Sequence, residues 1–319
     1  MDLRRLRFLR EFEVRGTLGA VATALDYSPS AVSQQLAILE KEVGAKLLEK
    51  AGRGVRLTDA GRILAGHAGV LLAAADAAAA DLASRTDFVR GTVRVSGLQS
   101  AARRLLVPAV ARLAVPYPGI RAEVRELEVE DALPELRLGS VDLLISDEYD
   151  GHPRPRPAGL TFDPLYVEPL MLVLPSAHPL AAPGGPVAIA ALRDEAWVAS
   201  EPGSGHHTMV VGTCRSLGGF DPDLRHHCYD AEVQLELVRQ AGAVGLLPKL
   251  TLPDADPAVA YREVAEKDLA RRLFVVTREG RDTPALATFL STLRDVASSL
   301  GDSQREADPR DAPAGRADP

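Results

Sequence analysis

The chain has 319 residues, of which 46% are hydrophobic and 25% charged, a balance typical of globular proteins. Because single hydrophobic cores stop growing at about 250–300 residues, this length predicts two or three domains. There is no apolar run of about 18 residues, and Arg and Glu interrupt the first stretch, MDLRRLRFLREFEVRG. We therefore expect no signal peptide, no membrane partner and a cytoplasmic location in which the two cysteines stay reduced.

The net charge of −7 divides unevenly along the chain. Residues 1–62 hold 11 Lys and Arg against 8 Asp and Glu, whereas the remaining residues hold 26 against 36. A mildly basic head on an acidic body is compatible with a polyanion-binding head. A solvated surface would show much the same asymmetry, so the spacing of the motifs has to decide.

The first 27 residues predict two helices. Residues 3–15 have apolar side chains at helical steps, and TLGAVATALDY has the composition of a short Ala-rich helix. Their expected inward-facing residues are Leu6, Leu9, Phe12, Val21, Ala22 and Leu25.

The stretch SPSAVSQQLAILEKEVG predicts a third helix with clear ends. Ser28 can cap its N-terminus, Pro29 suits its first position, and Gly44 can end it. Steps of four, three and four residues predict one buried stripe, formed by Val32, Leu36, Leu39 and Val43. With the helix before it and a short turn between, this third helix forms a predicted helix-turn-helix.

The opposite face of the third helix carries small and hydrogen-bonding side chains, which suits close approach to the major groove. Gln34 can pair with adenine, with about 1–3 kcal/mol of discrimination, and a wing predicted in KAGRGVRLT can hold phosphates through its arginines. The expected DNA contacts are Ser28, Ser30, Ser33, Gln34, Ala37, Lys41, Arg53 and Arg56. The alternative is an ordinary helical hairpin facing water, but such a face usually carries more Lys and Glu.

The segment TLGAVATALDYSPSAVSQQLAILEKEVGAKLLEKAGRGVRLTDAGR resembles the N-terminal domain of the LysR-type transcriptional regulators. The resemblance lies in the helix order, the Ala-Val-Ser-x-Gln core, LEKEVGAKLLEK and the exit RGVRLTDAG. It implies a bacterial regulator that binds double-stranded promoter DNA as a homodimer or homotetramer and responds to a small-molecule effector. Gln34 stands where many relatives carry Arg, and Ser30 where many carry Pro, so the resemblance transfers no base preference.

Residues 58–84 predict one long, Ala-rich helix that Thr58 can cap. Its apolar residues alternate in steps of four and three, which is typical of a coiled-coil seam. The expected dimerisation seam is Leu64, Ala68, Leu71, Ala75, Ala78 and Leu82. The alternative is a long helix that packs on its own domain.

Beyond Gly91 the pattern changes to alternating strands and helices. TVRVSG, IRAEVREL and VDLLIS predict strands, and AARRLLVPAVARLAV and VEDALPELRLG predict helices. A second run from LYVEPLMLVLP to AVGLLP repeats the alternation, and RLFVVT and PALATFLSTLRDVASSL return to the first lobe. This predicts two α/β lobes with a largely parallel sheet, joined by crossing strands around a cleft.

This half resembles the effector domain of the same family in VRVSG, YPGI, VDLLIS, LPSAHPLA and AGAVGLLP. The resemblance implies a fold like that of periplasmic solute-binding proteins, with the ligand between the lobes. Ligands of open α/β sheets bind at the carboxyl ends of strands, often at a helix N-terminus. The expected effector contacts are Leu98, Gln99, Ser100, Asp147, Glu201, Ser204 and Gly245. Alternatively, these residues are ordinary caps and turns.

Three sharper interpretations are not favoured. Cys214 and Cys228 lack an evident thiolate-stabilising context for a redox switch, apart from the arginine beside Cys214. The adjacent pairs His206–His207 and His226–His227 match no standard metal spacing. PGSGH lacks the first glycine of a nucleophile elbow. We therefore expect no metal, no cofactor and no enzyme activity.

The predicted fold class is a multidomain α+β protein with a winged helix-turn-helix, a linker helix and a two-lobed α/β effector domain. The expected boundaries are 1–58 for the DNA-binding domain, 59–90 for the linker and 91–300 for the effector domain, followed by a disordered tail over 301–319. The first lobe covers about 91–162 and 268–300, and the second about 163–267. The competing hypothesis is a cytoplasmic small-molecule-binding or catalytic α/β protein whose helical head does not read DNA.

Overall fold

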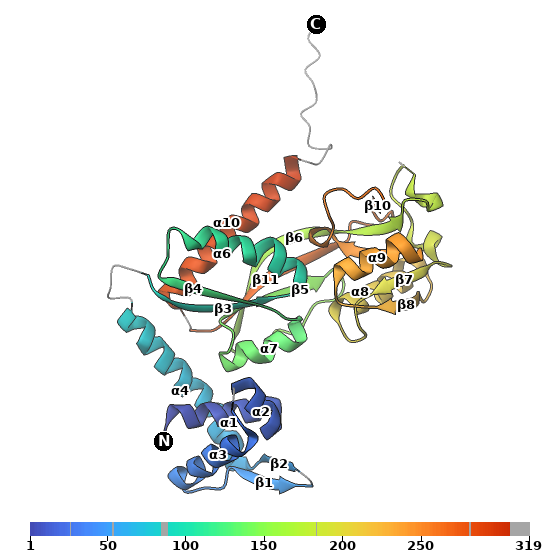
Figure 1. Ribbon diagram of the computed structural model, residues 1–319. Helices are drawn as coiled ribbons and strands as arrows, with labels where there is room; N and C mark the ends of the chain where they lie inside the picture. The colour runs from blue at the N-terminus through green and yellow to red at the C-terminus, as the bar shows by residue number, and fades with distance from the viewer. Residues whose placement is uncertain (26, 53, 84–88, 183, 281, 307–319) are drawn as a thin grey trace.

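The computed structural model describes the chain except for residues 26, 53, 84–88, 183, 281 and 307–319. Its N-terminal head is built from α1 (Leu3–Arg15), α2 (Leu18–Leu25), α3 (Pro29–Val43), β1 (Leu48–Ala51) and β2 (Gly54–Leu57). The strands β1 and β2 pair antiparallel and form a wing beside the helices (Figure 1). The head is therefore the winged helix-turn-helix that the spacing predicts.

The apolar stripes of the three helices meet in one core. Val32, Leu36 and Leu39 of α3 are fully buried there, together with inward-facing residues of α1 and α2. Ser28 caps α3 by accepting a hydrogen bond from the backbone N–H of Ala31 at 3.2 Å. Gly44 ends the helix with a φ of 68°, a left-handed conformation that glycine adopts without a Cβ penalty.

The long helix α4 (Asp59–Ala83) leaves the wing and lies along α1. Its first turns belong to the head, because Ala65 and Ala68 are buried in the head core and Leu64 packs against it. Farther along α4, Leu71 is exposed. No helix within the described ranges is long and apolar enough to cross a lipid bilayer.

The first lobe of the body is a sheet with helices on both faces (Figure 1). Its elements are β3 (Gly91–Gly97), α5 (Gln99–Ala101), a π-helical turn (Ala102–Leu106), α6 (Val107–Ala114), β4 (Ile120–Glu126), α7 (Val129–Leu138), β5 (Leu143–Tyr149), β11 (Ala270–Arg278) and α10 (Pro284–Glu306). In Figure 1, α6 and α10 cover one face, whereas α7 covers the face turned toward the head.

The second lobe packs around Trp197, which is fully buried. Its elements are the distal part of β6 (Leu160–Pro175), two 3-10 turns (Pro179–Ala181 and Ile189–Leu192), β7 (Ala196–Ala199), α8 (Gly205–Thr213), a π-helical turn (Cys214–Gly218), β8 (Asp223–His227), α9 (Ala231–Ala241), β9 (Gly245–Pro248), a 3-10 turn (Lys249–Thr251) and β10 (Val259–Arg262).

The main sheet is mixed, which corrects the prediction of a largely parallel one. Its strand order is β10-β6-β11-β5-β3-β4, with β9 also paired to β6. β3 runs parallel to β4 and β5, whereas β11 runs antiparallel to β5 and β6. The chain enters the second lobe through β6 and returns through β11, so these neighbouring strands must run in opposite directions.

The C-terminal helix α10 is longer than expected, because it continues to Glu306. The first six residues of the predicted disordered tail are therefore helical. No proline occurs between Pro284 and Pro309, so no missing N–H interrupts the helical hydrogen bonds in this stretch. The rest of the predicted tail lies outside the described residues.

Candidate functional site

The outer face of α3 is a continuous exposed surface of small and polar side chains. Between Ser28 and Ala37 its exposed side chains carry no charge. Gln35 points away from this surface and accepts a hydrogen bond from Arg5 Nε at 3.2 Å, whereas within the described ranges Gln34 makes no internal hydrogen bond. The exposed side chains among the predicted contacts on and beside α3 are Ser28, Ser30, Ser33, Gln34, Ala37 and Lys41.

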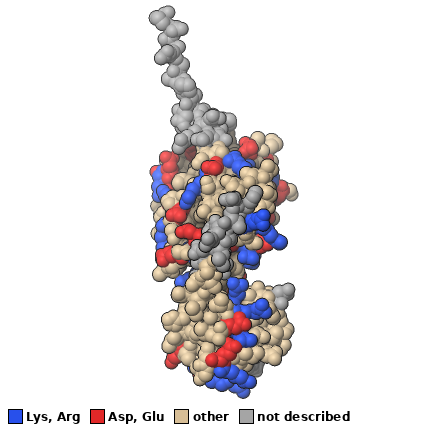
Figure 2. All heavy atoms as spheres, turned by 90° about the vertical axis from the view of Figure 1, so that its left-hand side faces the viewer, with Lys and Arg blue, Asp and Glu red and all other residues tan. Residues whose placement is uncertain are grey.

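The wing adds basic side chains beside this surface. Arg56 is exposed and its Nε donates to Glu49 Oε1 at 2.8 Å, and Lys50 is also exposed. Arg53, the other predicted wing contact, lies outside the described residues. Figure 2 shows Lys and Arg side chains gathered at the lower tip of the head, the end that carries α3 and the wing in Figure 1.

Glu40 fixes the wing relative to α3, a role that the spacing did not reveal. Its Oε1 accepts hydrogen bonds from the backbone N–H groups of Leu47 and Leu48 at 2.9 and 3.1 Å, and its Oε2 lies 2.8 Å from Lys46 Nζ. Burial alone would raise the pKa of Glu40, but these donors hold it below its ordinary value. A carboxylate of α3 thereby organises the entry to β1.

A cavity opens between the two lobes beyond the carboxyl ends of β3 and β5. It contains about 480 Å³ of empty space, part of it open to solvent. The first lobe and the crossing strands contribute Leu98, Gln99, Ser100, Glu128, Asp147, Tyr149, Arg154 and Arg271. The second lobe contributes Ser200, Gly205, His206, Tyr229, Ala231 and Gln234, among others.

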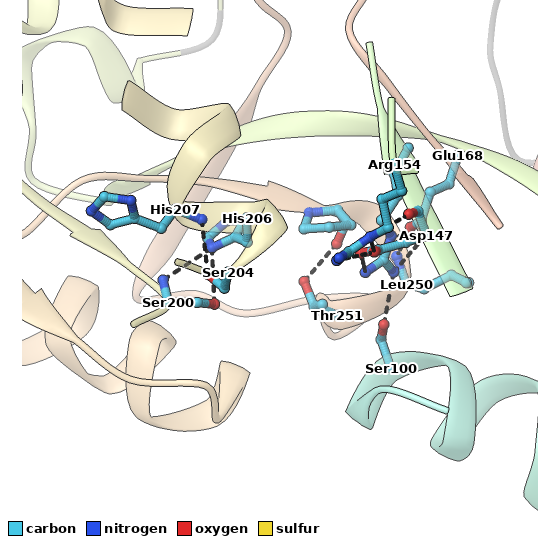
Figure 3. Close-up of polar contacts among 12 residues, drawn as sticks. Ser100, Asp147, Arg154, Glu168, Ser200, Ser204, His206, His207, Leu250 and Thr251 are labelled. Atoms are coloured by element: carbon cyan, nitrogen blue, oxygen red, sulfur yellow. Dashed lines mark hydrogen bonds and ion pairs between the residues drawn. The ribbon is translucent and has the colours of Figure 1, made fainter. Parts of the chain in front are cut away.

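Arg271 lines the cavity and is almost completely buried. Its Nε and Nη2 donate to Glu168 Oε1 at 2.8 and 2.6 Å, and Nη2 also donates to Ser100 Oγ at 2.7 Å. Burial raises the pKa of Glu168, and the guanidinium and the Leu250 N–H at 2.6 Å oppose part of that rise. Ser100 therefore helps to hold an internal ion pair (Figure 3).

Arg154 forms a second ion-paired group at the cavity wall (Figure 3). Its Nε and Nη2 donate to Asp147 Oδ1 at 3.0 and 2.8 Å, and its Nη1 donates to Glu130 Oε1 at 2.6 Å. A Cβ at Gly205 would lie 2.6 Å from Arg154 Nη2, so glycine leaves room for the guanidinium to pack against α8. Asp147 thus faces the cavity with one of its oxygens already bound.

On the second lobe, His206 is locked in one tautomer. Its Nδ1 accepts from the Ser200 backbone N–H at 3.1 Å (Figure 3). This leaves Nε2 to donate to Leu246 O at 2.9 Å. Burial lowers the pKa of His206 to about 4, so the ring is neutral at pH 7. The two lobes also touch directly, since Gln99 Oε1 accepts from the Ala231 N–H at 3.1 Å.

The predicted effector residues separate into two groups. Leu98, Gln99, Ser100 and Asp147 line the cavity, whereas Glu201, Ser204 and Gly245 do not. Ser204 caps α8 by accepting from the His207 N–H at 3.1 Å. Gly245 lies in β9, where a Cβ would come within 3.3 Å of Val198. The first group follows the strands of the first lobe.

Five other cavity residues were not predicted as effector contacts: Glu128, Arg154, His206, Gln234 and Arg271. A carboxylate preceding a predicted helix, as Glu128 does, could have been considered. The arginines could not, because each lies on a strand or connection whose partner depends on the tertiary fold.

The predicted dimerisation residues also separate along α4. Leu64 and Ala68 contact the head core, Leu71 and Ala78 are exposed, Ala75 is partly buried, and the side chain of Leu82 lies outside the described residues. Ile63 and Val70 expose 65% and 68% of their surface, so α4 presents an apolar face that the head does not cover.

The residues considered for redox or metal chemistry all lie in the second lobe. Cys214 is buried in the second lobe, where burial raises the pKa of its thiol to about 12. Among the residues whose placement is described, no group of three or more His, Cys, Asp and Glu side chains has a geometry that could hold a metal ion.

Comparison with known proteins covers both the head and the body. The model described as "Bacterial regulatory helix-turn-helix protein, lysR family" matches residues 3–62, and "LysR substrate binding domain" matches residues 86–298. A probable hydrogen peroxide-inducible genes activator of Mycobacterium avium is 30% identical over 300 residues, covering 92% of this chain and 91% of the relative.

Two further comparisons extend over most of the chain. The transcriptional dual regulator GltC of Bacillus subtilis is 28% identical over 257 residues, covering 81% of this chain and 84% of that protein. A full-length OxyR variant from Pseudomonas aeruginosa superposes with a TM-score of 0.67 at 19% identity, covering 93% of this chain and 97% of that one. At this identity the structural comparison establishes the shared fold.

Proposed function

Because the chain belongs to the LysR family of bacterial helix-turn-helix transcriptional regulators, we propose that it reads promoter DNA through the exposed face of α3. The observation that carries the proposal is the uncharged stretch of exposed side chains from Ser28 to Ala37, with Gln34 free of internal hydrogen bonds within the described ranges. An amide at this position can contact adenine in the major groove, while Arg56 and Lys50 contact phosphates.

We place the regulating small molecule in the inter-lobe cavity, which both lobes line. A ligand that binds one arrangement of the lobes more tightly than another shifts the population of DNA-bound assemblies. The boundaries at residues 58, 90 and 300 remain our proposal for the division into head, linker and effector domain.

We propose a homodimer or homotetramer that assembles along α4, in the cytoplasm, without catalytic activity. The exposed Ile63, Val70 and Leu71 support this helix as the interface, because an isolated apolar stripe gains stability when a second copy covers it. Since Leu64 and Ala68 are used within the head, the contacts between copies are expected from Leu71 onward and from the Ile63 side.

We also propose that the signal is a bound ligand rather than oxidation of a thiol. The name of the Mycobacterium avium relative refers to hydrogen peroxide, and a peroxide-reactive cysteine needs a stabilised thiolate. Burial raises the pKa of Cys214 to about 12, and burial with Asp230 and Glu201 raises that of Cys228. Both thiols therefore stay protonated at neutral pH.

The first test is retention of genomic DNA fragments by the purified protein near physiological salt, followed by sequencing of what is retained. Wild type is expected to enrich discrete sites with two-fold symmetry, and Gln34→Ala to lose or relax preference at defined positions, by about 1–3 kcal/mol. Arg56→Ala should weaken binding to all sequences and reduce its salt dependence.

Gln35→Ala is the matched control, because the same substitution falls on the side of α3 that faces Arg5. It should keep the sequence preference of wild type. If wild type binds duplexes weakly and without preference, the head does not read DNA and the competing hypothesis of a cleft-based activity is favoured.

A further inference from the structure

The two arginines that line the cavity are already paired with carboxylates, which disfavours an anionic ligand. Both arginines that line it are occupied: Arg271 by Glu168, and Arg154 by Asp147 and Glu130. Releasing either guanidinium to bind an anion would leave a buried carboxylate without its partner, which is strongly destabilising. Both lining guanidinium groups are thus already ion-paired, and the lining His206 is neutral at pH 7.

One carboxylate at the cavity wall lacks a partner. Glu128 lies at the start of α7 and lines the cavity, and within the described part of the chain it makes no hydrogen bond or ion pair. Burial, followed by repulsion from Asp147 and Glu130, raises the pKa of Glu128 to about 7, although Arg154 attracts its charge. A partly buried carboxylate without a partner is stabilised when a hydrogen-bond donor or a cation approaches it.

A second acceptor without a partner comes from the opposite lobe. Gln234 is 2% exposed and lines the same cavity, and its Oε1 has no hydrogen-bond partner among the described residues. The amide orientation is fixed, because Nε2 donates to Cys228 O at 2.6 Å. Turning the amide over would place two carbonyl oxygens against each other. Buried carbonyl oxygens normally accept a hydrogen bond, so we expect a ligand to donate one to Gln234 Oε1.

Among the described residues, Glu128 and Gln234 Oε1 are thus two acceptors without a partner at this cavity, one from each lobe. Asp147, Glu130 and Glu168 are already paired with the two guanidinium groups that line the cavity, which leaves Glu128 as its unpaired carboxylate within the described ranges. We infer that the effector carries a nitrogen cation, an ammonium or amidinium group, which pairs with Glu128 and donates hydrogen bonds in the inter-lobe cavity. This inference rests on the proposed function, because it assigns a chemical class to the same effector site.

The test compares small ions of matched shape and opposite charge. Thermal unfolding of the full-length protein is followed at pH 8 with millimolar benzamidine against benzoate, and with 1,4-diaminobutane against succinate. At least one cation is expected to raise the Tm in a saturable manner, because a ligand that binds the folded state stabilises it. Its anionic counterpart should not.

Glu128→Gln should abolish the Tm increase or weaken the cation's affinity at least tenfold. Glu126→Gln is the matched control: it removes the same charge from an exposed residue two positions earlier that does not line the cavity. Stabilisation by the anions, no stabilisation by either cation, or an unchanged response in Glu128→Gln would each overturn the inference.

A pH series gives an independent readout. The charged and titratable groups acting on Glu128 are Asp147, Glu130, Arg154, Glu126 and Tyr229. Because the pKa of Glu128 is raised to about 7, cation binding must displace a proton below that pH. Affinity should therefore fall about tenfold from pH 8 to pH 6. If the cation binds with the same affinity at all pH values, it binds away from Glu128, which would contradict the inference.

DNA retention, measured on the same preparation, separates this inference from the proposed function. Sequence-specific retention without cation binding overturns the chemical class alone. Loss of sequence-specific retention overturns the regulator itself, whatever the cavity binds.

Discussion

His206 shows how burial decides the chemistry of a single side chain. Two neighbouring histidines occur in the sequence, yet they differ: His206 is buried between Ser200 and Leu246, whereas His207 is half-buried near His227. Burial holds the pKa of His206 down to about 4, and the ring then serves as a neutral hydrogen-bonding bridge. It links the end of β7 to β9.

This burial predicts a specific pH dependence of stability. The folded state favours neutral His206, so its contribution is complete above the ordinary histidine pKa of about 6.5 and is lost as the pH falls toward 4, by roughly 3 kcal/mol at most. In His206→Gln the unfolding free energy should decline less steeply between pH 6.5 and 4.5. Denaturant unfolding followed by the fluorescence of Trp197 measures this slope.

His67→Gln provides the control, because His67 is an exposed residue of α4. It should keep the slope of wild type. A wild-type slope in His206→Gln would mean that His206 takes up its proton in the folded protein.

At the level of elements, α3 and the wing act as one unit because Glu40 joins them. Charge-assisted hydrogen bonds to backbone N–H groups contribute more than an exposed ion pair does. Glu40 makes two such bonds to the segment entering β1, whereas Glu49 makes an exposed pair with Arg56. The position of the wing therefore depends on a residue of α3 that lies outside the proposed DNA-contacting face.

Glu40→Ala is expected to lower the unfolding free energy by about 2 kcal/mol and to weaken DNA binding, since the wing loses its anchor. Because the pKa of Glu40 is lowered by its donors, this contribution is complete at pH 7 and is lost as the pH falls through the folded pKa. Glu49→Ala should change stability by no more than about 1 kcal/mol. Equal losses in the two variants would argue against the anchor.

At the level of the whole molecule, α7 lies between the cavity and the head. Glu128, just before its first residue, lines the cavity, and Glu130 in its first turn accepts from Arg154 of the cavity wall. Glu135, farther along α7, accepts a hydrogen bond from Arg15 of α1. Arg15 also donates at 2.6 Å to Glu11, and Glu11 is 2% exposed. Burial lowers the pKa of Arg15, but its bonds to Glu11 and Glu135 raise it overall. One helix thus contacts both functional regions of the chain.

Glu135→Gln should loosen this contact without unpairing Glu11. We expect faster hydrogen exchange in the last turn of α1, measured by mass spectrometry, because the ion pair with Arg15 is lost. High salt should have a similar effect on wild type. Asp131→Asn, an exposed change on the same helix, should leave α1 unaffected. Unchanged exchange in Glu135→Gln would show that head and body do not depend on this contact.

The sequence determined the local architecture, because spacing within one element depends on that element alone. The cap of α3 at Ser28 and its end at Gly44 formed as predicted, and three of the four stripe residues are fully buried, whereas Val43 is partly buried against the same core. The sequence also predicted the cavity positions after β3, because residues that follow a strand lie at the edge of the sheet. Leu98, Gln99 and Ser100 accordingly line the cavity.

The tertiary structure alone decided which partners these elements have. Ser100 meets Arg271 across 171 residues, and that contact depends on where β11 inserts in the sheet. The spacing of Leu64 and Ala68 is compatible with packing against a second helix from any chain. In this structure the second helix is α1 of the same chain. Periodicity shows that a face will be buried, but only the folded chain specifies what buries it.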